Sequence, residues 1–220
     1  WWWCCEKENK KIYIRIFRVL ATNNSDTSYA DWHLARCCVR MGWMKWNKEY
    51  RSTYPEALKL NPSLFQIVKN NYAGRVQGEG RRTAYNLHQK KIKEVDMLLT
   101  WIKNILPRVA YEYTQGGDDK CTMEQVGFNV DSFMINACWG IVYNKGEGVV
   151  KHNHFPYALN FVYCVNLPKK SSPLVIEGRK IKQTAGEVIF FLPHQYHWVE
   201  PSKSDGKCVI TGNILYGSNK

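Results

Sequence analysis

Apolar residues recur at helical spacing in the middle of the chain. The pair Asn61-Pro62 is typical of a helix start, because Asn caps exposed N–H groups and Pro suits the first turn. We therefore predict a short helix from there, and after it a longer amphipathic helix that ends at Pro107. The apolar face of the longer helix is formed by Ile92, Val95, Leu98, Leu99, Ile102 and Ile105.

From residue 126 onward, the pattern changes to short β-type runs that are separated by turns. Strands are expected at residues 133–143, 149–152, 159–166, 174–177, 187–192 and 208–215. Short strands at this spacing are typical of a sandwich or barrel, whereas a doubly wound parallel sheet needs helices between its strands. The sequence therefore predicts the α+β class.

The change of pattern divides the chain into three segments. Residues 1–56 hold six of the nine Trp and show poor apolar periodicity, so we interpret them as an atypical N-terminal extension. Residues 57–125 would form a helical region that supports the barrel, and residues 126–220 the barrel and catalytic core. No uninterrupted apolar run approaches the roughly 20 residues that a membrane-spanning helix needs, so no membrane partner is expected.

Positive charge is concentrated in the first half of the chain. Residues 1–110 hold 20 Lys and Arg against 9 Asp and Glu, whereas residues 111–220 hold 11 against 10. Such an excess attracts polyanions over a Debye length of about 10 Å, although it can equally be a solvated helical face. A weak contact with a polyanion or nucleic acid is predicted for residues 74–93.

The eight cysteines form no Cys-x-x-Cys pair, and no secretory signal segment precedes them in the printed sequence. This pattern is typical of reduced cysteine. We therefore expect an intracellular, cytoplasmic protein.

Three histidines in the strand-rich half have the spacing of a metal site. His152 and His154 are two residues apart, so both side chains point to one face of an extended segment. A distant strand must supply the third ligand, and His197 is the candidate. Three protein ligands on one face leave positions open for a bidentate co-substrate and O₂, as non-haem Fe(II) oxygenases require.

Residues 83–220 resemble the iron(II)/2-oxoglutarate-dependent dioxygenases, and within them a largely phage-encoded subgroup. The resemblance rests on the order of Thr83 to His88, Trp139 to Gly146, His152-Asn153-His154, Asn160 to Val165, Gly186 to Pro193, His197 and the strand from Lys207. It implies a double-stranded β-helix of the jelly-roll or cupin type. It also implies Fe(II) as metal, 2-oxoglutarate as co-substrate, and hydroxylation of an unidentified substrate, in the host cytoplasm if the gene is viral.

By this resemblance His152 is the first iron ligand and His197 the distal one. The family usually has Asp or Glu two residues after the first His, and this chain has His154. We expect His154 to be a ligand, which makes the ligand set electrically neutral. The alternative is that His154 serves the substrate and leaves the third position to water.

The family usually anchors the far carboxylate of 2-oxoglutarate on Arg or Lys about ten residues after the distal His, and Lys207 stands there. Lys207, Thr211 and Asn213 share one face of the final strand, and this polar face could line a cavity. Thr211 is expected to assist Lys207, and Tyr163 and Asn160 are further candidates for co-substrate binding. The alternative is an exposed edge strand with a solvated lysine.

Two other functions stay open at this point. One is a cupin-like protein whose three His hold zinc or another metal without 2-oxoglutarate. The other is a basic jelly-roll binding module, or a virion-associated one, in which the histidines are incidental.

Overall fold

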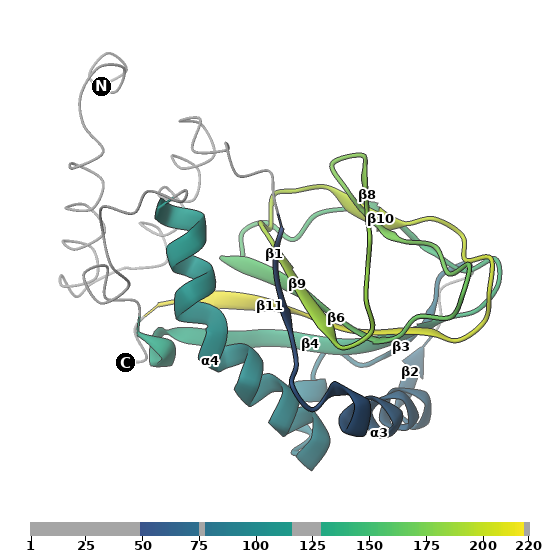
Figure 1. The fold of residues 1–220 in the computed structure, drawn as a ribbon, viewed down its shortest axis with the longest axis horizontal. Coiled ribbons are helices and arrows are strands. Elements are labelled where there is room, and N and C mark those ends of the chain that lie inside the picture. Colours follow the sequence, from purple (N-terminus) through teal and green to yellow (C-terminus); the bar gives the residue numbers. More distant parts are fainter. Residues whose placement is uncertain (1–48, 75–77, 116–128, 218–220) are drawn as a thin grey trace.

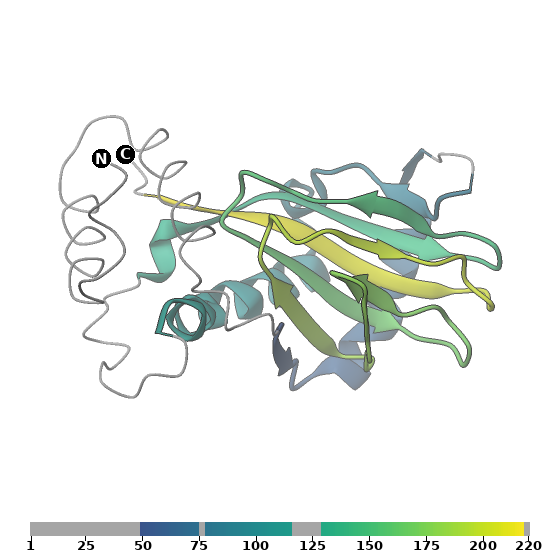
Figure 2. The same cartoon turned by 90° about the horizontal axis from the view of Figure 1, so that it is seen from above.

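The computed structural model describes residues 49–74, 78–115 and 129–217 (Figure 1). Its larger sheet has seven strands in the order β1-β9-β6-β11-β4-β3-β2. Their bounds are β1 Tyr50–Thr53, β2 Tyr72–Gly74, β3 Arg81–Thr83, β4 Phe133–Tyr143, β6 Leu159–Asn166, β9 Glu187–Phe191 and β11 Lys207–Tyr216. Figure 2 shows β11, in yellow, between its neighbours β4 and β6.

The smaller sheet has four strands in the order β5-β10-β7-β8. They are β5 Val149–His152, β7 Leu174–Ile176, β8 Arg179–Ile181 and β10 His197–Val199. All strand pairs in both sheets are antiparallel. Alternate use of the two sheets by β4 to β11 makes a jelly roll, so the predicted α+β class with a double-stranded β-helix is confirmed.

Helices α3 (Ala57–Asn70) and α4 (Lys93–Gln115) lie on the side of the large sheet that faces away from the small one (Figure 1). The short 3-10 helices η1 (Leu87–Gln89) and η2 (Val130–Ser132) connect them to the strands. Buried side chains of α3 and α4 pack against one face of the large sheet. Those that the sheet and the helices bury completely include Leu64, Val68, Val95, Leu98, Ile102, Leu106 and Val109.

The predicted helix boundaries are corrected at two prolines. Helix α3 begins at Ala57, so Asn61 and Pro62 lie inside it rather than at its start. Helix α4 continues through Pro107 to Gln115. Proline removes one backbone hydrogen bond, but Val109 and Ala110 continue the buried face beyond it, and their burial favours the longer helix.

Two apolar clusters occupy the two faces of the large sheet, because neighbouring residues of a strand point to opposite sides. Cys208, Ile210 and Ile214 of β11 join the cluster under the helices. Val209 joins the second cluster, which lies between the sheets. The alternation predicted for the final strand therefore holds.

The barrel sheet draws on more of the chain than residues 126–220. Strand β1 lies within the segment interpreted as an extension, and it pairs with β9. Strands β2 and β3 come from the segment expected to be helical. Residues 1–48 and 116–128 lie outside the described residues. In the described part of the chain, no helix is long and apolar enough to cross a membrane.

Candidate metal centre and co-substrate cavity

The three candidate histidines meet where the small sheet faces the large one. His152 is the last residue of β5 and His197 the first of β10, and the two are paired in register across these strands. His154 follows β5 by two residues. Its backbone N–H donates to the carbonyl of Pro193 at 2.8 Å, which ties its loop to the segment before β10.

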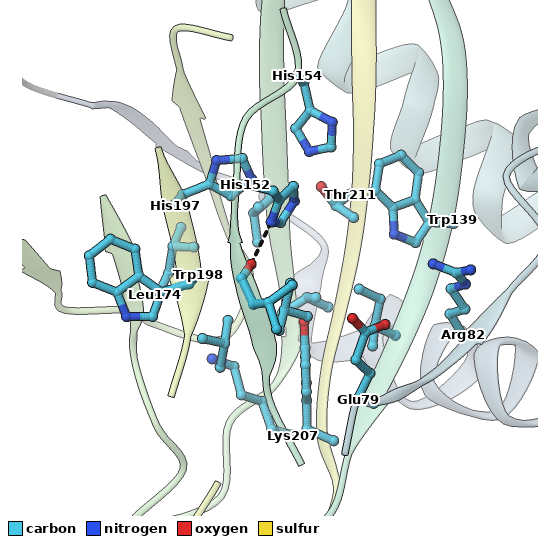
Figure 3. Close-up of a pocket in the computed structure, with 18 of the residues that line it drawn as sticks. Glu79, Arg82, Trp139, His152, His154, Leu174, His197, Trp198, Lys207 and Thr211 are labelled. Atoms are coloured by element: carbon cyan, nitrogen blue, oxygen red, sulfur yellow. Dashed lines mark hydrogen bonds between the residues drawn. The ribbon is translucent and has the colours of Figure 1, made fainter. Parts of the chain in front are cut away.

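The imidazoles converge on one point (Figure 3). One ring nitrogen of each lies within 4.8 Å of those of the other two. The ring centroids of His152 and His197 are 4.3 Å apart, and those of His154 and His197 are 5.0 Å apart. Two imidazole nitrogens bound to one metal at about 2.0–2.1 Å lie at most about 4.2 Å apart, so small rotations of the rings would bring the three nitrogens onto one ion.

Backbone carbonyls orient two of the rings. Nδ1 of His152 lies 2.8 Å from the carbonyl oxygen of Val150, and Nδ1 of His197 lies 3.0 Å from that of Gln195. A carbonyl can only accept, so each Nδ1 carries the proton and donates it, which leaves Nε2 with its lone pair toward the metal position.

Burial keeps the imidazoles of His154 and His197 neutral. Burial, and then the nearby His152, lower the pKa of His197 to about 3. The same two causes lower the pKa of His154 to about 4. Neutral imidazole is the form that binds a metal, and among divalent metals it suits Fe, Zn, Cu and Ni. No carboxylate joins this group in the described part of the chain.

A cavity of about 290 Å³ begins at the histidines and extends between the sheets. Lys207 lines it and is only 1% exposed, because β11 is a central strand; the solvated edge-strand alternative is thus excluded. The Lys207 Nζ donates to the carbonyl of Ser172 at 2.5 Å and to Oε1 of Gln183 at 3.0 Å. Burial lowers the pKa of Lys207 to about 8. Two of its three N–H groups are thereby used, and one is left for a ligand.

Thr211 cannot assist Lys207 in the way that the sequence predicts. It lines the cavity, as expected. Its hydroxyl, however, donates to the carbonyl of Phe161 at 2.7 Å. Since a hydroxyl has a single proton, Thr211 cannot also donate to a carboxylate held by Lys207.

Asn160 and Asn213 lie opposite each other on β6 and β11. Asn160 is 1% exposed, and neither its Nδ2 nor its Oδ1 has a partner among the described residues. Oδ1 of Asn213 is unpartnered as well, and Asn213 lines the cavity. An unsatisfied buried amide costs about 1–3 kcal/mol, so this pair needs a ligand or a water. Asn213 was missed as a site residue, although the alternation along β11 already placed it on the polar face.

Tyr163 does not belong to the site, which corrects the expectation from sequence. It lies between Val162 and Cys164, which face the cavity side, so its own side chain points to the helices. There its hydroxyl donates to Oδ1 of Asn61 at 2.7 Å. The aromatic residue in the central strand is a core residue with a satisfied hydroxyl.

The cavity also contains residues that were not recognised as site residues from sequence, among them Glu79, Arg82, Tyr85 and Trp139. Three of these lie in β3 or beside it, and the pairing of β3 with β4 brings them to the cavity. No local motif signals this placement.

No family model and no curated protein matches the chain. Solved structures do match. A prolyl-4-hydroxylase from Pseudomonas putida superposes with a TM-score of 0.53 at 15% identity, covering 79% of this chain and 95% of that one. A 2OG-Fe(II) oxygenase family oxidoreductase from Burkholderia pseudomallei gives 0.52 at 12%, covering 90% and 95%. The α-ketoglutarate-dependent epimerase SnoN from nogalamycin biosynthesis gives 0.55 at 12%, covering 86% and 83%. At such identities the likeness shows the shared fold.

Proposed function

We propose that the protein is an Fe(II)- and 2-oxoglutarate-dependent dioxygenase that hydroxylates an unidentified substrate. One observation carries the proposal: three imidazoles converge on one possible ligand position at one end of a cavity that a buried lysine also lines. Structural neighbours that include a 2OG-Fe(II) oxygenase family member and an α-ketoglutarate-dependent epimerase support it, since they share the fold.

His152, His154 and His197 would hold the iron. Three protein ligands on one face would leave room for a chelating keto acid and O₂. Bound iron and 2-oxoglutarate would supply the oxidation, in which O₂, the keto acid and a substrate C–H group are converted to succinate, CO₂ and a hydroxylated substrate. Because imidazole ligands carry no charge, the charge of the iron would be balanced by the co-substrate rather than by the protein.

The remaining cavity residues would position the co-substrate. Lys207 offers a point charge and one unused N–H to the distal carboxylate. Asn160 offers an amide whose Nδ2 and Oδ1 both lack partners among the described residues, and Asn213 offers an unpartnered Oδ1. Apolar side chains such as Val209, Leu174 and Val162 line the space around them and exclude water. Thr211 fixes β11 to β6 instead of contacting the ligand.

The order of the motifs along the sequence supports membership of this protein in the phage-type subgroup. The free, buried cysteines Cys138, Cys164 and Cys208 support a reducing, cytoplasmic location, in a host cell if the gene is viral. The weak polyanion contact at residues 74–93 stays a prediction.

Anaerobic titration of the metal-free protein with Fe(II) and then 2-oxoglutarate tests the proposal. A visible charge-transfer band that needs both additions is expected. Iron binding without the band would instead favour the cupin-like metal protein, and no metal binding at all would favour the binding module. Zinc in place of iron is the control, since zinc has no redox chemistry and gives no such band.

A further inference from the structure

We propose that Glu79, Arg82, Tyr85 and Trp139, here called the charged wall, bind a small zwitterionic substrate of the amino-acid type. Its carboxylate would lie on Arg82 and its ammonium group on Glu79. The inference rests on the proposed function, because it names the substrate class of that site. Figure 3 shows Glu79, Arg82 and Trp139 on one side of the cavity, across from His197 and Trp198.

The register of β3 with β4 makes the Arg82 side chain point into the cavity. Arg82 is paired with Ile141, whose side chain lies in the cluster between the sheets. Its neighbour Arg81 is paired with Val142, which packs under the helices, and the Arg81 guanidinium lies 5.9 Å from the Tyr72 ring. The two adjacent arginines therefore serve opposite faces of the sheet, and only one of them can meet a ligand in the cavity.

Arg82 is already held in place. Its Cζ lies 4.9 Å from the centre of the Tyr85 ring, and its Nη1 donates to the Tyr85 hydroxyl at 2.6 Å. No carboxylate in the described part of the chain forms an ion pair with it. Since the ring covers one face of the guanidinium, its free N–H groups point along its edge, where a carboxylate binds with two parallel hydrogen bonds.

A line of rings leads from Arg82 to the metal position. The Tyr85 ring lies 4.8 Å from that of Trp139, edge to face, and the Trp139 ring lies 5.8 Å from that of His154. A ligand held by Arg82 can thus lie along Trp139 and bring a C–H group beside the histidines. The aromatic surface would take the aliphatic part of the substrate.

Glu79 selects against ligands that are only anionic. Its half-buried carboxylate lines the same cavity and has no ion-pair partner among the residues that the structure describes. In the part of the cavity that it lines, away from Lys207 and the histidines, an unpaired carboxylate repels an anionic group and attracts an ammonium group. One cation and one anion on the same wall are satisfied together only by a zwitterion.

Cavity size limits the substrate further. A volume of about 290 Å³ is at the low end of the roughly 300–1,000 Å³ range of small-molecule sites, and the co-substrate must share it. A free amino acid fits this space better than a chain segment would. The histidines and Lys207 lie elsewhere on the lining, so both molecules have separate anchors.

The test measures binding of free amino acids to the full chain by calorimetry under anaerobic conditions, with Fe(II) and 2-oxoglutarate present. Each amino acid is compared with its N-acetyl and its carboxamide derivative. The variants are Arg82→Gln and Glu79→Gln, and Arg81→Gln is the matched control. Formation of the iron–2-oxoglutarate band is recorded first, so a failure of the proposed function is recognised separately.

At least one amino acid should bind and shift the visible band. Arg82→Gln should weaken the binding of this amino acid roughly ten- to a hundredfold, as expected for loss of a charge-assisted pair, and Arg81→Gln should leave the binding unchanged. The carboxamide should bind the unsubstituted protein as weakly as the amino acid binds Arg82→Gln. A normal band with no amino acid bound, or binding that both arginine variants affect equally, would overturn the inference.

Discussion

His152 and His197 face each other directly across the antiparallel strands β5 and β10. Each ring is oriented by a carbonyl two residues before it in its own chain segment, that of Val150 or of Gln195. Rigid strands and local hydrogen bonds thus hold this pair. His154 lies beyond the strand, and it depends on backbone hydrogen bonds with Pro193 and Tyr157 and on its ring contacts with Trp139 and the other two histidines.

Loss of His197 should affect iron binding more than loss of His154. His197→Ala removes one of the two strand-held ligands, so iron binding should be abolished. His154→Ala removes a loop ligand that water can replace, so binding should only weaken. Equilibrium dialysis with Fe(II) measures this, with His194→Ala as control. Equal loss in the His154 and His197 variants would mean that all three ligands are equally required.

Lys207→Ala should weaken 2-oxoglutarate binding without changing iron content. A charge-assisted pair contributes about 1.5–3 kcal/mol, so the half-saturation concentration should rise roughly ten- to a hundredfold. Uncoupled 2-oxoglutarate turnover gives this value, and exposed Lys203→Ala is the matched control. An unchanged half-saturation concentration would place the carboxylate anchor elsewhere.

The affinity for 2-oxoglutarate should fall as the pH rises above about 8. Burial lowers the pKa of Lys207 to about 8, so the free protein loses the ammonium charge above that pH. Without ligand, the same pKa shift affects folding. Between about pH 8 and the usual lysine pKa near 10.4, the unfolded chain binds more protons than the folded chain, so the free energy of unfolding rises with pH in this range. Measuring the half-saturation concentration of 2-oxoglutarate from pH 6.5 to 9.5 tests this prediction. The Lys207→Ala protein should show no such dependence.

Gly140→Ala should destabilise the fold. A Cβ atom built on Gly140 of β4 would overlap the side chain of Val68 on α3. Overpacking of this kind typically costs about 1–3 kcal/mol. Denaturant unfolding measures the loss, and Gly74→Ala, whose added Cβ meets no atom, is the control. Equal stability of the two variants would show that α3 can move aside.

Weak binding to polyanions, if centred on residues 74–93, should decrease steeply with salt. Arg81, Lys90 and Lys91 are candidates for contact with a polyanion, whereas Arg82 faces the cavity. Charge reversal of Arg81, Lys90 and Lys91 together should therefore reduce heparin retention, and reversal of Arg82 alone should reduce it less. Retention that survives the triple reversal would contradict this prediction.

The sequence by itself determined the parts that depend on local periodicity. Alternation and turns placed β4, β5 and β6 at the residues where they are found. His-x-His spacing marked His152 and His154, because residues two apart share a face in any extended segment. The polar face of β11 was also correct, which brought Lys207 into the cavity.

Tertiary structure decided what depends on partners distant in the chain. The Thr211 hydroxyl donates to the carbonyl of Phe161 on the neighbouring strand β6, and α3 covers the face of β6 on which Tyr163 lies and supplies Asn61 as the partner of its hydroxyl. Arg81 and Arg82 are neighbours in one basic run, yet the register of β3 with β4 sends them to opposite faces. Sequence patterns report which residues share a face, but strand pairing decides what that face meets, since the pairing partners can be distant in sequence.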